Sequence, residues 1–509
     1  MRMIDRRRFM VSLGALAAAP VLARFASYPF GLGVASGYPT PASVVLWTRL
    51  MGELPPAPIR VRWEISSDER MRTIVDSGEI LADPAWAHSA RVEVQGLAPG
   101  RWYWYRFSAG DAQSAIGRTR TAPPPDAAAP RLRFAFASCQ QYEHGWYGAY
   151  RHIVADAPDL IVFLGDYIYE ASWGSNHVRS HGAPSAYSLE DYRARYALYK
   201  SDPDLQAAHA ACPWIATWDD HEVVNDYADD RAAFNVDRRR FLERRAAAYR
   251  AYYEHMPLPP RMRPEGAFLR LHTSLDWGRL ARFHVLDDRQ YRSWQACPPE
   301  DPRRPGVFAG STTLDVSRCP ELDDPRRTIL GTAQERWLEG SLTESGAAWN
   351  VLAQQTRMAQ LDQQLGPGRR AWTDGWDGYP VARRKLLEFI RDKSIANPVV
   401  IGGDVHAFNV ADLKTDFDDA RSPVVASEFV GSSITSHGWP QERFDALRGD
   451  NPHMLLMESR HRGYVRVAVT PKSWAADLRA METVLERNAA CNTLKSFVVE
   501  SGRPGPIPA

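Results

Sequence analysis

The feature that most constrains the fold of this chain is a series of short, continuous apolar runs, each ending in polar or glycine residues. Runs of this length are typical of strands that are buried on both faces of a sheet. They occupy residues 132–138, 160–165, 214–218, 279–287, 349–354, 398–403 and 423–429. Stretches that suit helices lie between several of them, at residues 145–156, 332–342 and 383–393. The pattern predicts the α/β class with a mixed sheet.

The region before residue 123 has shorter, alternating strands. The turn Gly96-Leu97-Ala98-Pro99-Gly100 precedes an aromatic strand, as in the late strands of fibronectin type III sandwiches. We therefore predict a small all-β sandwich over residues 29–122, with a structural role. The strands are expected at residues 43–48, 60–65, 89–94 and 102–107.

A proline-rich segment at residues 121–130 is predicted to form a stiff linker between two units. A chain of 509 residues is too long for one ordinary core, which agrees with this division. The larger α/β domain is expected over residues 131–480, followed by a C-terminal tail at 481–509. A helical stretch and a Gly/Pro-rich cap are expected within residues 470–509.

The N-terminus has the composition of a signal peptide, predicted over residues 1–26. A basic flank precedes a short apolar run at residues 11–23, which is too short for a stable membrane anchor. Paired arginines followed one residue later by Phe9 resemble a twin-arginine signal, with an ordinary secretory signal as the alternative. We expect export by the twin-arginine machinery, cleavage after Ala23 or Ala26, and a periplasmic or secreted protein without a membrane anchor.

Charge and cysteine content narrow the classes of function. The formal net charge is +1, whereas nucleic-acid binders concentrate a basic excess on one face, so no nucleic-acid-binding surface is expected. A small phosphorylated substrate remains compatible, because metals can supply positive charge locally. Five cysteines leave at least one thiol unpaired in an exported chain, and Cys139 is the candidate. Cys297 and Cys319 flank a loop that they could bridge, although the sequence alone leaves the pairing open.

Side chains capable of chemistry follow the predicted strands. The carboxyl ends of strands in an α/β sheet face one crevice, so segments that are distant in sequence can deliver side chains to one site. We expect these residues to form that site. In chain order they are Cys139, Asp166, Tyr169, Asp220, His221, Asp404 and His406.

The candidate ligands differ in chemical hardness. Carboxylates suit a hard cation, whereas the thiolate of Cys139 and the phenolate of Tyr169 favour a transition metal such as iron. His406 follows Asp404 by two residues, so both lie on the same side of an extended segment. The mixture predicts a heterogeneous centre with at least two metals, which suits phosphoryl transfer.

Other polar residues have supporting roles in this prediction. His221 is placed to bind a phosphate oxygen or to protonate a leaving alkoxide. Asn225 and Gln355 are amide-oxygen candidates of lower rank as metal or phosphate ligands. Arg289 could hold a substrate phosphate, but a structural salt bridge is the alternative.

Seven segments together resemble the PhoD-like alkaline phosphatase/phosphodiesterase family, which is distantly related to purple acid phosphatases. The resemblance runs nearly from end to end. It implies metallophosphoesterase-type mixed sheets with helices, and an enzyme that hydrolyses phosphate esters with a metal-activated hydroxide. The segments are FASCQ (136–140), GDYIYE (165–170), WDDHE (218–222), LDDRQY (286–291), LGTAQERW (330–337), WDGYP (376–380) and GGDVH (402–406).

The resemblance also implies the cofactors, a mixed site of Ca²⁺ and Fe³⁺ whose stoichiometry stays open. Asp166 would bridge the metals. Cys139, Tyr169 and His406 would join it on the iron.

Asp220 and Asp404 would hold calcium by the same resemblance. The sequence departs from the family in the loop after His221. The family usually has an acidic residue at the position of Val224 and Asn at the position of Asp226, whereas Asn225 is kept. The departure puts in doubt a ligand role for Asp226.

Two functions of other classes stay open from the residues alone. An exported glycoside hydrolase would use paired carboxylates, but it would leave Cys139, Tyr169 and His406 without roles. A non-catalytic binding module would use the N-terminal sandwich and would not need polar residues at so many strand ends.

Overall fold

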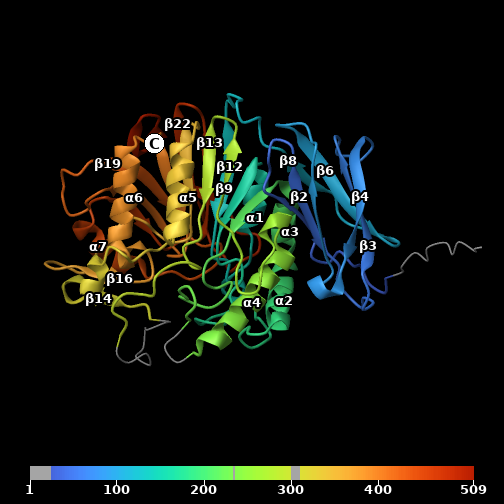
Figure 1. The fold of residues 1–509 in the computed structure, drawn as a ribbon, viewed down its shortest axis with the longest axis horizontal. Coiled ribbons are helices and arrows are strands. Elements are labelled where there is room, and N and C mark those ends of the chain that lie inside the picture. The colour runs from blue at the N-terminus through green and yellow to red at the C-terminus, as the bar shows by residue number, and fades with distance from the viewer. Residues whose placement is uncertain (1–24, 233–235, 300–309) are drawn as a thin grey trace, which may run out of the picture.

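The computed structural model of the chain describes residues 25–232, 236–299 and 310–509. Two large sheets form its centre, and the N-terminal strands lie at one end of the molecule (Figure 1). The paired arginines of the predicted signal and the first predicted cleavage position, Ala23, lie outside the described residues. None of the described helices combines the length and the apolar composition that crossing a membrane requires.

The first large sheet has ten strands within the described residues. Its centre is parallel, because β10 pairs in parallel with both β9 and β11, and antiparallel strands extend it on both sides. In spatial order the strands are β24 (Arg503–Pro508), β23 (Cys491–Glu500), β22 (Ser473–Met481), β21 (Gly463–Val469), β9 (Leu132–Ala137), β10 (Leu160–Leu164), β11 (Trp214–Thr217), β1 (Val34–Gly37), β2 (Val44–Arg49) and β5 (Ser89–Val94).

The second large sheet has seven strands in the same part of the chain. Its four central strands, from β13 to β19, are parallel, and the outer strands pair antiparallel. In spatial order they are β12 (Thr273–Trp277), β13 (Ala281–Val285), β15 (Trp349–Ala353), β17 (Pro398–Gly402), β19 (Val424–Val430), β18 (Phe408–Lys414) and β20 (Met454–Glu458). The predicted mixed α/β arrangement is therefore present, but it is divided between two sheets.

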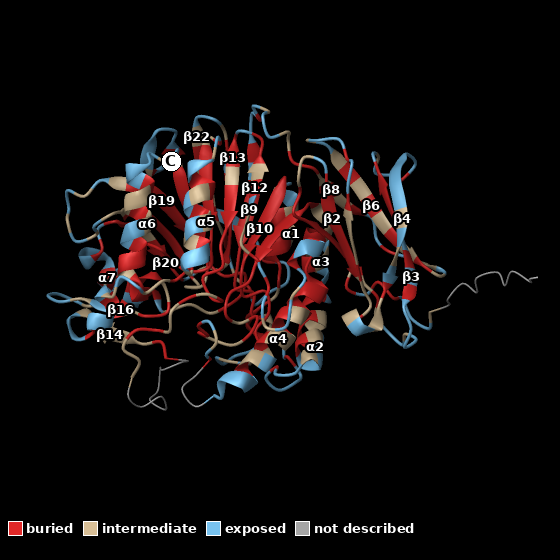
Figure 2. Ribbon diagram, viewed as in Figure 1, coloured by how far each residue is buried: buried red, intermediate tan, exposed pale blue. Residues whose placement is uncertain are grey.

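The two sheets pack face to face through large aromatic side chains. The ring of Phe134 on β9 lies 5.3 Å from that of Phe283 on β13, and the ring of Trp474 on β22 lies 6.3 Å from that of Phe429 on β19. Alternate residues of a strand point to opposite faces, so Val351 of β15 joins this shared core, whereas Leu352 joins a second core under the helices. The central strands of both sheets are buried, and exposed residues lie on the outer faces of the helices (Figure 2).

Helices cover the outer faces of this sandwich. α5 and α6 lie over the seven-stranded sheet, as Figure 1 shows, and their apolar residues form the second core. Ser188 starts α2 with a capping box, and Asp202 caps α3 through two backbone N–H groups. The helices are α1 (Ala149–Ala155), α2 (Leu189–Lys200), α3 (Pro203–Ala211), α4 (Arg238–His255), α5 (Thr332–Thr343), α6 (Pro380–Asp392) and α7 (Gln441–Leu447).

Shorter elements complete the described chain. A two-stranded sheet of β14 (Thr313–Asp315) and β16 (Arg370–Trp372) lies beside the carboxyl ends of the second sheet. The 3-10 helices are η1 (Pro84–Trp86), η2 (Tyr142–His144), η3 (Pro260–Met262), η4 (Val316–Arg318), η5 (Pro320–Asp323), η6 (Trp376–Gly378) and η7 (Arg448–Asp450).

The N-terminal region forms a second, smaller sandwich. A five-stranded sheet packs on β1, β2 and β5 around a separate apolar core. β1 also pairs with β11 at Gly37, where a Cβ atom would lie 2.7 Å from the carbonyl oxygen of Pro257. One sheet of the predicted sandwich is therefore continuous with the large sheet, and the predicted boundary at residues 122–131 stays a prediction. The five strands are β3 (Ile59–Ser66), β4 (Ile74–Ala82), β6 (Trp102–Ala109), β7 (Ala112–Gln113) and β8 (Gly117–Arg120).

The prediction of a helical stretch within residues 470–509 is wrong. Three strands, β22 to β24, extend the ten-stranded sheet there. In β22 the buried side chains alternate, from Trp474 to Leu478, with a period of two residues, which is the pattern of a strand with one buried face. Pairing with β21 supplies the hydrogen bonds that decide the conformation.

We expect Phe497→Ala to lower the free energy of unfolding by about 3 kcal/mol, because its buried ring packs inside the sandwich. Leu494→Ala is the matched control, since Leu494 lies on the same strand with 38% of its surface exposed. Urea unfolding of both variants, followed by tryptophan fluorescence, measures the difference. Equal stabilities of the two variants would contradict the placement of β23 in the sheet.

Candidate functional site

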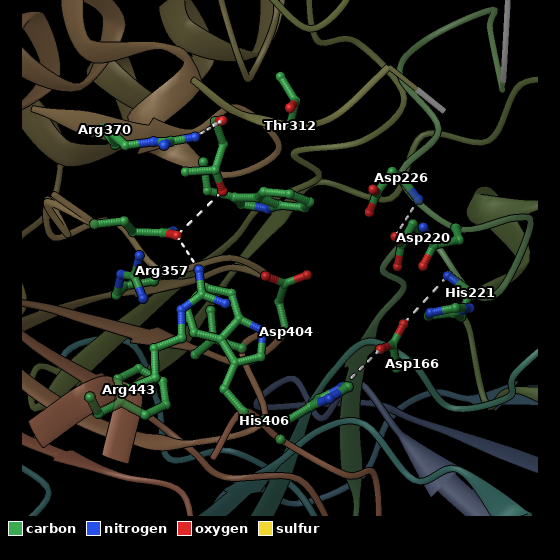
Figure 3. Close-up of a pocket in the computed structure, with 18 of the residues that line it drawn as sticks. Asp166, Asp220, His221, Asp226, Thr312, Arg357, Arg370, Asp404, His406 and Arg443 are labelled. Atoms are coloured by element: carbon green, nitrogen blue, oxygen red, sulfur yellow. Dashed lines mark hydrogen bonds and ion pairs between the residues drawn. The ribbon is translucent and has the colours of Figure 1, made fainter. Parts of the chain in front are cut away.

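A cavity of about 580 Å³ opens where the carboxyl ends of strands from both large sheets meet. Six of the predicted site residues line it, and Figure 3 shows how the labelled ones face its interior. Cys139 and Tyr169 are fully buried behind the cavity wall, where they lie against the lining residues. The six lining residues are Asp166, Asp220, His221, Asn225, Asp404 and His406.

One group of ligand atoms combines a thiol, a carboxylate and an imidazole. Atoms of Cys139, Asp166 and His406 all lie within 4.8 Å of one another. The Tyr169 hydroxyl lies 2.8 Å from Asp166 Oδ2, 3.0 Å from His406 Nε2 and 2.7 Å from Ser436 Oγ. The structure therefore brings together the four residues that the resemblance assigns to iron: Cys139, Asp166, Tyr169 and His406.

Two further groups continue from the first through shared carboxylates: Asp166 joins the first group to the second, and Asp220 joins the second to the third. Asp166, Asp220 and His221 meet within 4.8 Å, as do Asp220, Asp226 and Asp374. Asp166 and Asp220 each belong to two groups, which is the arrangement expected of carboxylates that lie between cations. Asp226 therefore lies among candidate ligands despite the departure of its loop from the family pattern. Asp374, which follows the short strand β16, was not predicted from the sequence.

The backbone at these positions is unusual. Cys139, Asp166, Asp404 and His406 have φ values of 58°, 56°, 64° and 52°, in the left-handed region that non-glycine residues rarely adopt. Each such residue costs of order 1–3 kcal/mol, and surrounding contacts must hold it there. Four candidate ligands around one cavity thus share a strained backbone. This strain indicates a functional site without reference to the chemistry of the side chains.

Neighbouring loops hold two of these strained residues in place. His406 Nδ1 donates to the carbonyl oxygen of His437 at 2.7 Å, and Arg462 donates to the carbonyl oxygen of His406. Ser436 Oγ donates to the carbonyl oxygen of Cys139 at 2.8 Å. The loop after β19 thus fixes ligand candidates from both sheets.

Arg289 is fully buried among carboxylates. Its guanidinium contacts Asp219, lies 2.5 Å from Asp374 and 3.1 Å from Asp404, and lies 3.8 Å from Asp220. It is absent from the cavity lining. The geometry supports the structural salt bridge, the alternative to a substrate contact.

The two lower-rank amide candidates lie in different surroundings. Asn225 lines the cavity, and its backbone N–H donates to Glu170 Oε1 at 3.1 Å. Gln355 is buried outside the lining, where its amide bonds to Asp288 N–H, the Thr217 hydroxyl and the Leu286 carbonyl. Gln355 therefore joins β11 to the end of β13 and β15, away from the space where a ligand would bind.

His221 faces the cavity with its ring fixed. Its Nδ1 lies 2.7 Å from Glu170 Oε2, and its ring centroid lies 4.2 Å from that of Tyr169. Burial alone lowers the pKa of His221, but the carboxylates of Glu170, Asp220 and Asp166 outweigh it and hold the pKa well above 6.5. Burial alone raises the pKa of Glu170, yet the charge of His221 brings it below its ordinary value. The two residues form a charged pair, which the sequence analysis did not predict.

The donor set fits metal cations. Burial raises the pKa of Cys139 and of Tyr169 well above their ordinary values, and the Asp166 carboxylate raises both further. Burial also raises the pKa of Asp404, to about 8. Buried oxygens of Asp219 and Asp288 have no hydrogen-bond partner among the described residues. Positive charge at this place would stabilise the anionic forms that metal ligation requires.

Comparisons with known proteins decide the family. A profile of PhoD-like phosphatases matches residues 134–478, and the profile of their N-terminal domain matches residues 15–123. Alkaline phosphatase D of Bacillus subtilis (strain 168) is 44% identical over 535 residues, covering 98% of this chain and 88% of that protein. A solved structure of PhoD matches with a TM-score of 0.90 at 43% identity, covering 96% of this chain and 93% of that chain. The chain belongs to the PhoD-like phosphatase family.

Membership confirms the resemblance, the fold class and the enzyme class that were predicted from the sequence. A PhoD-like phosphatase is a phosphoric ester hydrolase. This class disfavours the glycoside hydrolase and the binding module, the two alternatives that the residues left open.

A disulfide joins two segments of this PhoD-like chain that lie close in sequence to residues of the cavity lining. Cys297 and Cys319 are bonded, which confirms the pairing that the sequence left open, and Cys139 is a free thiol as expected. The bonded residues lie close in sequence to Pro299, Thr312 and Thr313, which line the cavity.

We expect the double substitution Cys297→Ser/Cys319→Ser to lower the free energy of unfolding by about 3 kcal/mol, the value for a loop of this length. Thermal unfolding with and without dithiothreitol checks it, because reduced wild type should melt like the variant. Cys491→Ser, which removes a thiol that forms no disulfide, should keep the sensitivity to reductant. A wild-type midpoint that dithiothreitol leaves unchanged would contradict the stabilising role.

Proposed function

We propose that this chain is an exported, metal-dependent phosphatase and phosphodiesterase that acts on small phosphorylated substrates. The observation that carries the proposal is the sharing of Asp166 and Asp220 among three groups of metal-ligating atoms beside one cavity. Shared carboxylates place cations close together, as enzymes that transfer phosphoryl groups require. Export by the twin-arginine machinery rests on the composition of residues 1–26.

The proposed ligand sets follow the chemistry of the donors. Cys139, Asp166, Tyr169 and His406 would hold Fe³⁺, because thiolate, phenolate and imidazole suit a transition metal. Asp220, with other carboxylates, would hold Ca²⁺, because hard cations prefer oxygen. When bound, these cations would polarise phosphate oxygens and lower the pKa of an attacking water.

Asp404 is the proposed calcium ligand on the other sheet. It lines the cavity directly after β17 and lies 3.1 Å from the buried Arg289 guanidinium. Asp226 and Asp374 share the third group of ligand atoms with Asp220, so they are proposed to extend the calcium side of the centre. The Arg289 guanidinium lies 2.5 Å from Asp374 and 3.1 Å from Asp404 and offsets part of the repulsion between them.

His221 is the proposed catalytic residue of the chain itself. Burial lowers its pKa, but the carboxylates of Glu170, Asp220 and Asp166 raise it by a larger amount, which favours the protonated imidazole; the ring lines the cavity. It can donate a hydrogen bond to a phosphate oxygen, or give its proton to the oxygen of the departing alcohol. Glu170 accepts from Nδ1, which leaves Nε2 as the atom that faces substrate.

We expect Asp166→Asn to lose both metal content and hydrolysis of bis(4-nitrophenyl) phosphate, because Asp166 belongs to two ligand groups. Tyr169→Phe should remove a visible absorption band of the purified protein, since a phenolate on iron absorbs visible light. Elemental analysis and absorption spectra measure both effects. Tyr187→Phe, at an exposed position, serves as the control. A colourless, metal-free wild type that hydrolyses the ester would refute the metal centre.

We expect Glu170→Gln to lower kcat roughly tenfold to hundredfold while metal content stays at the wild-type level. The reason is that Glu170 contacts His221 and the backbone of Asn225, but is in none of the three ligand groups. Glu190→Gln removes an exposed carboxylate on α2 and is the matched control. A drop in metal content as large as the drop in kcat would show that Glu170 supports the metals and does not position His221.

A further inference from the structure

Opposite the acidic residues, the cavity has a side lined by arginines. Arg357 follows β15, Arg370 lies on β16 and Arg443 lies on α7, so three separate segments supply them. In Figure 3 these three lie on one side of the cavity, Asp220 lies on the other, and Asp404 lies between them. We call Arg357, Arg370 and Arg443 the arginine wall.

Each guanidinium of the arginine wall is held by neutral acceptors. Arg370 donates to the carbonyl oxygen of Thr313 at 3.0 Å, and Arg443 donates to Gln363 Oε1 at 2.5 Å. The guanidinium carbon of Arg443 also lies 3.6 Å from the ring centroid of Trp439. In the described ranges, no carboxylate lies within 4.0 Å of the guanidinium of Arg370 or Arg443. Their orientation is therefore fixed. Asp315 lies opposite Arg370 across β14 and β16 and partly balances its charge, whereas Arg443 has only neutral partners among the described residues.

Arg357 is the most buried member, with only 8% of its surface exposed. Its Nε donates to the carbonyl oxygen of Ala359 at 3.2 Å. Its nearest carboxylate, Asp377 at 3.7 Å, is shared with Arg383, which binds it more closely at 2.6 Å. A buried cation that shares its nearest carboxylate with another arginine is only partly compensated, so an anion in the cavity would stabilise it.

We propose that the arginine wall binds a second anionic group of the substrate, such as a phosphate, phosphonate or carboxylate on the ester group that is not cleaved off. This rests on the proposed function, which places the scissile phosphate beside Asp166, Asp220 and His221. The cavity of about 580 Å³ lies in the range that accepts a drug-sized ligand, about 300–1,000 Å³, so it holds more than one phosphate group.

The shape of the cavity indicates that the anion is part of the substrate and not a separate ion. The arginine wall and the acidic residues line one continuous space, so one molecule can contact both. Trp372 and Trp439 line the same space and offer apolar surface to the part of the substrate between the two anions. The preferred substrates are therefore phosphodiesters that carry a further negative charge.

The test uses two chromogenic diesters, 4-nitrophenyl propyl phosphate and 4-nitrophenyl 2-phosphonoethyl phosphate, which differ in the added anion. Metal-loaded wild type should have the higher kcat/KM for the phosphonate diester. Arg443→Gln should lower the ratio of the two kcat/KM values by roughly fivefold, the effect of one partly exposed charge pair. Arg443→Lys should restore part of the ratio because it keeps the charge.

Arg448→Gln is the matched control: it removes the same charge just beyond α7, from a side chain that is 53% exposed and outside the cavity lining. Its ratio should equal that of wild type. Thermal unfolding of each variant confirms folding, and Arg370→Gln gives a second measurement if Arg443→Gln unfolds.

The outcomes separate the subsite from the proposed function. If wild type hydrolyses neither diester, the proposed function fails. If wild type hydrolyses both with equal kcat/KM, or if neither arginine substitution changes the ratio, the subsite is overturned. Free ethylphosphonate added to the propyl diester should not reproduce the gain; an equal gain would show that the arginine wall binds a separate anion and not the substrate.

Discussion

The structure depends on how it buries many carboxylates in one place. Asp219, Asp220, Asp374 and Asp404 reach the Arg289 guanidinium from the ends of three different strands. A buried charge without a partner is strongly destabilising, so removal of this arginine would leave several carboxylates uncompensated at once. Arg289 therefore fixes the ends of the two sheets relative to one another, and the cavity exists because both sheets end there.

One guanidinium does not balance so many acids, and this imbalance has a consequence for the free protein. The carboxyls of Asp219, Asp226 and Asp404 all have raised pKa values, first through burial and then through neighbouring acids. A raised pKa favours the neutral form of a carboxyl, and added positive charge would favour the ionised form. Cations and the ionised site stabilise one another, so metal binding is linked to the release of protons and to the stability of the fold.

Much of this arrangement could be predicted from the sequence, because continuous apolar runs and the polar residues after them are local patterns. They located the strands that carry Cys139, Asp166, Asp220 and Asp404. The division into two sheets depends on long-range pairing. The C-terminal strands were not predicted, because pairing with β21 and not the local pattern alone decides their conformation. The Glu170–His221 pair and the role of Asp374 depend on contacts across the fold, which no local pattern records.

The left-handed backbone at Cys139, Asp166, Asp404 and His406 explains why strand ends can form such a site. A strand that continued in extended geometry would carry its next side chains alternately to the two faces of the sheet, away from the crevice. A positive φ at the first residues after the strand turns the chain at once, so the ligand atom stays at the sheet edge. The strain is offset by contacts from the loop after β19 and by Arg462, which hold Cys139 and His406 from outside the ligand set. The precision of the site thus comes from residues that take no part in the chemistry.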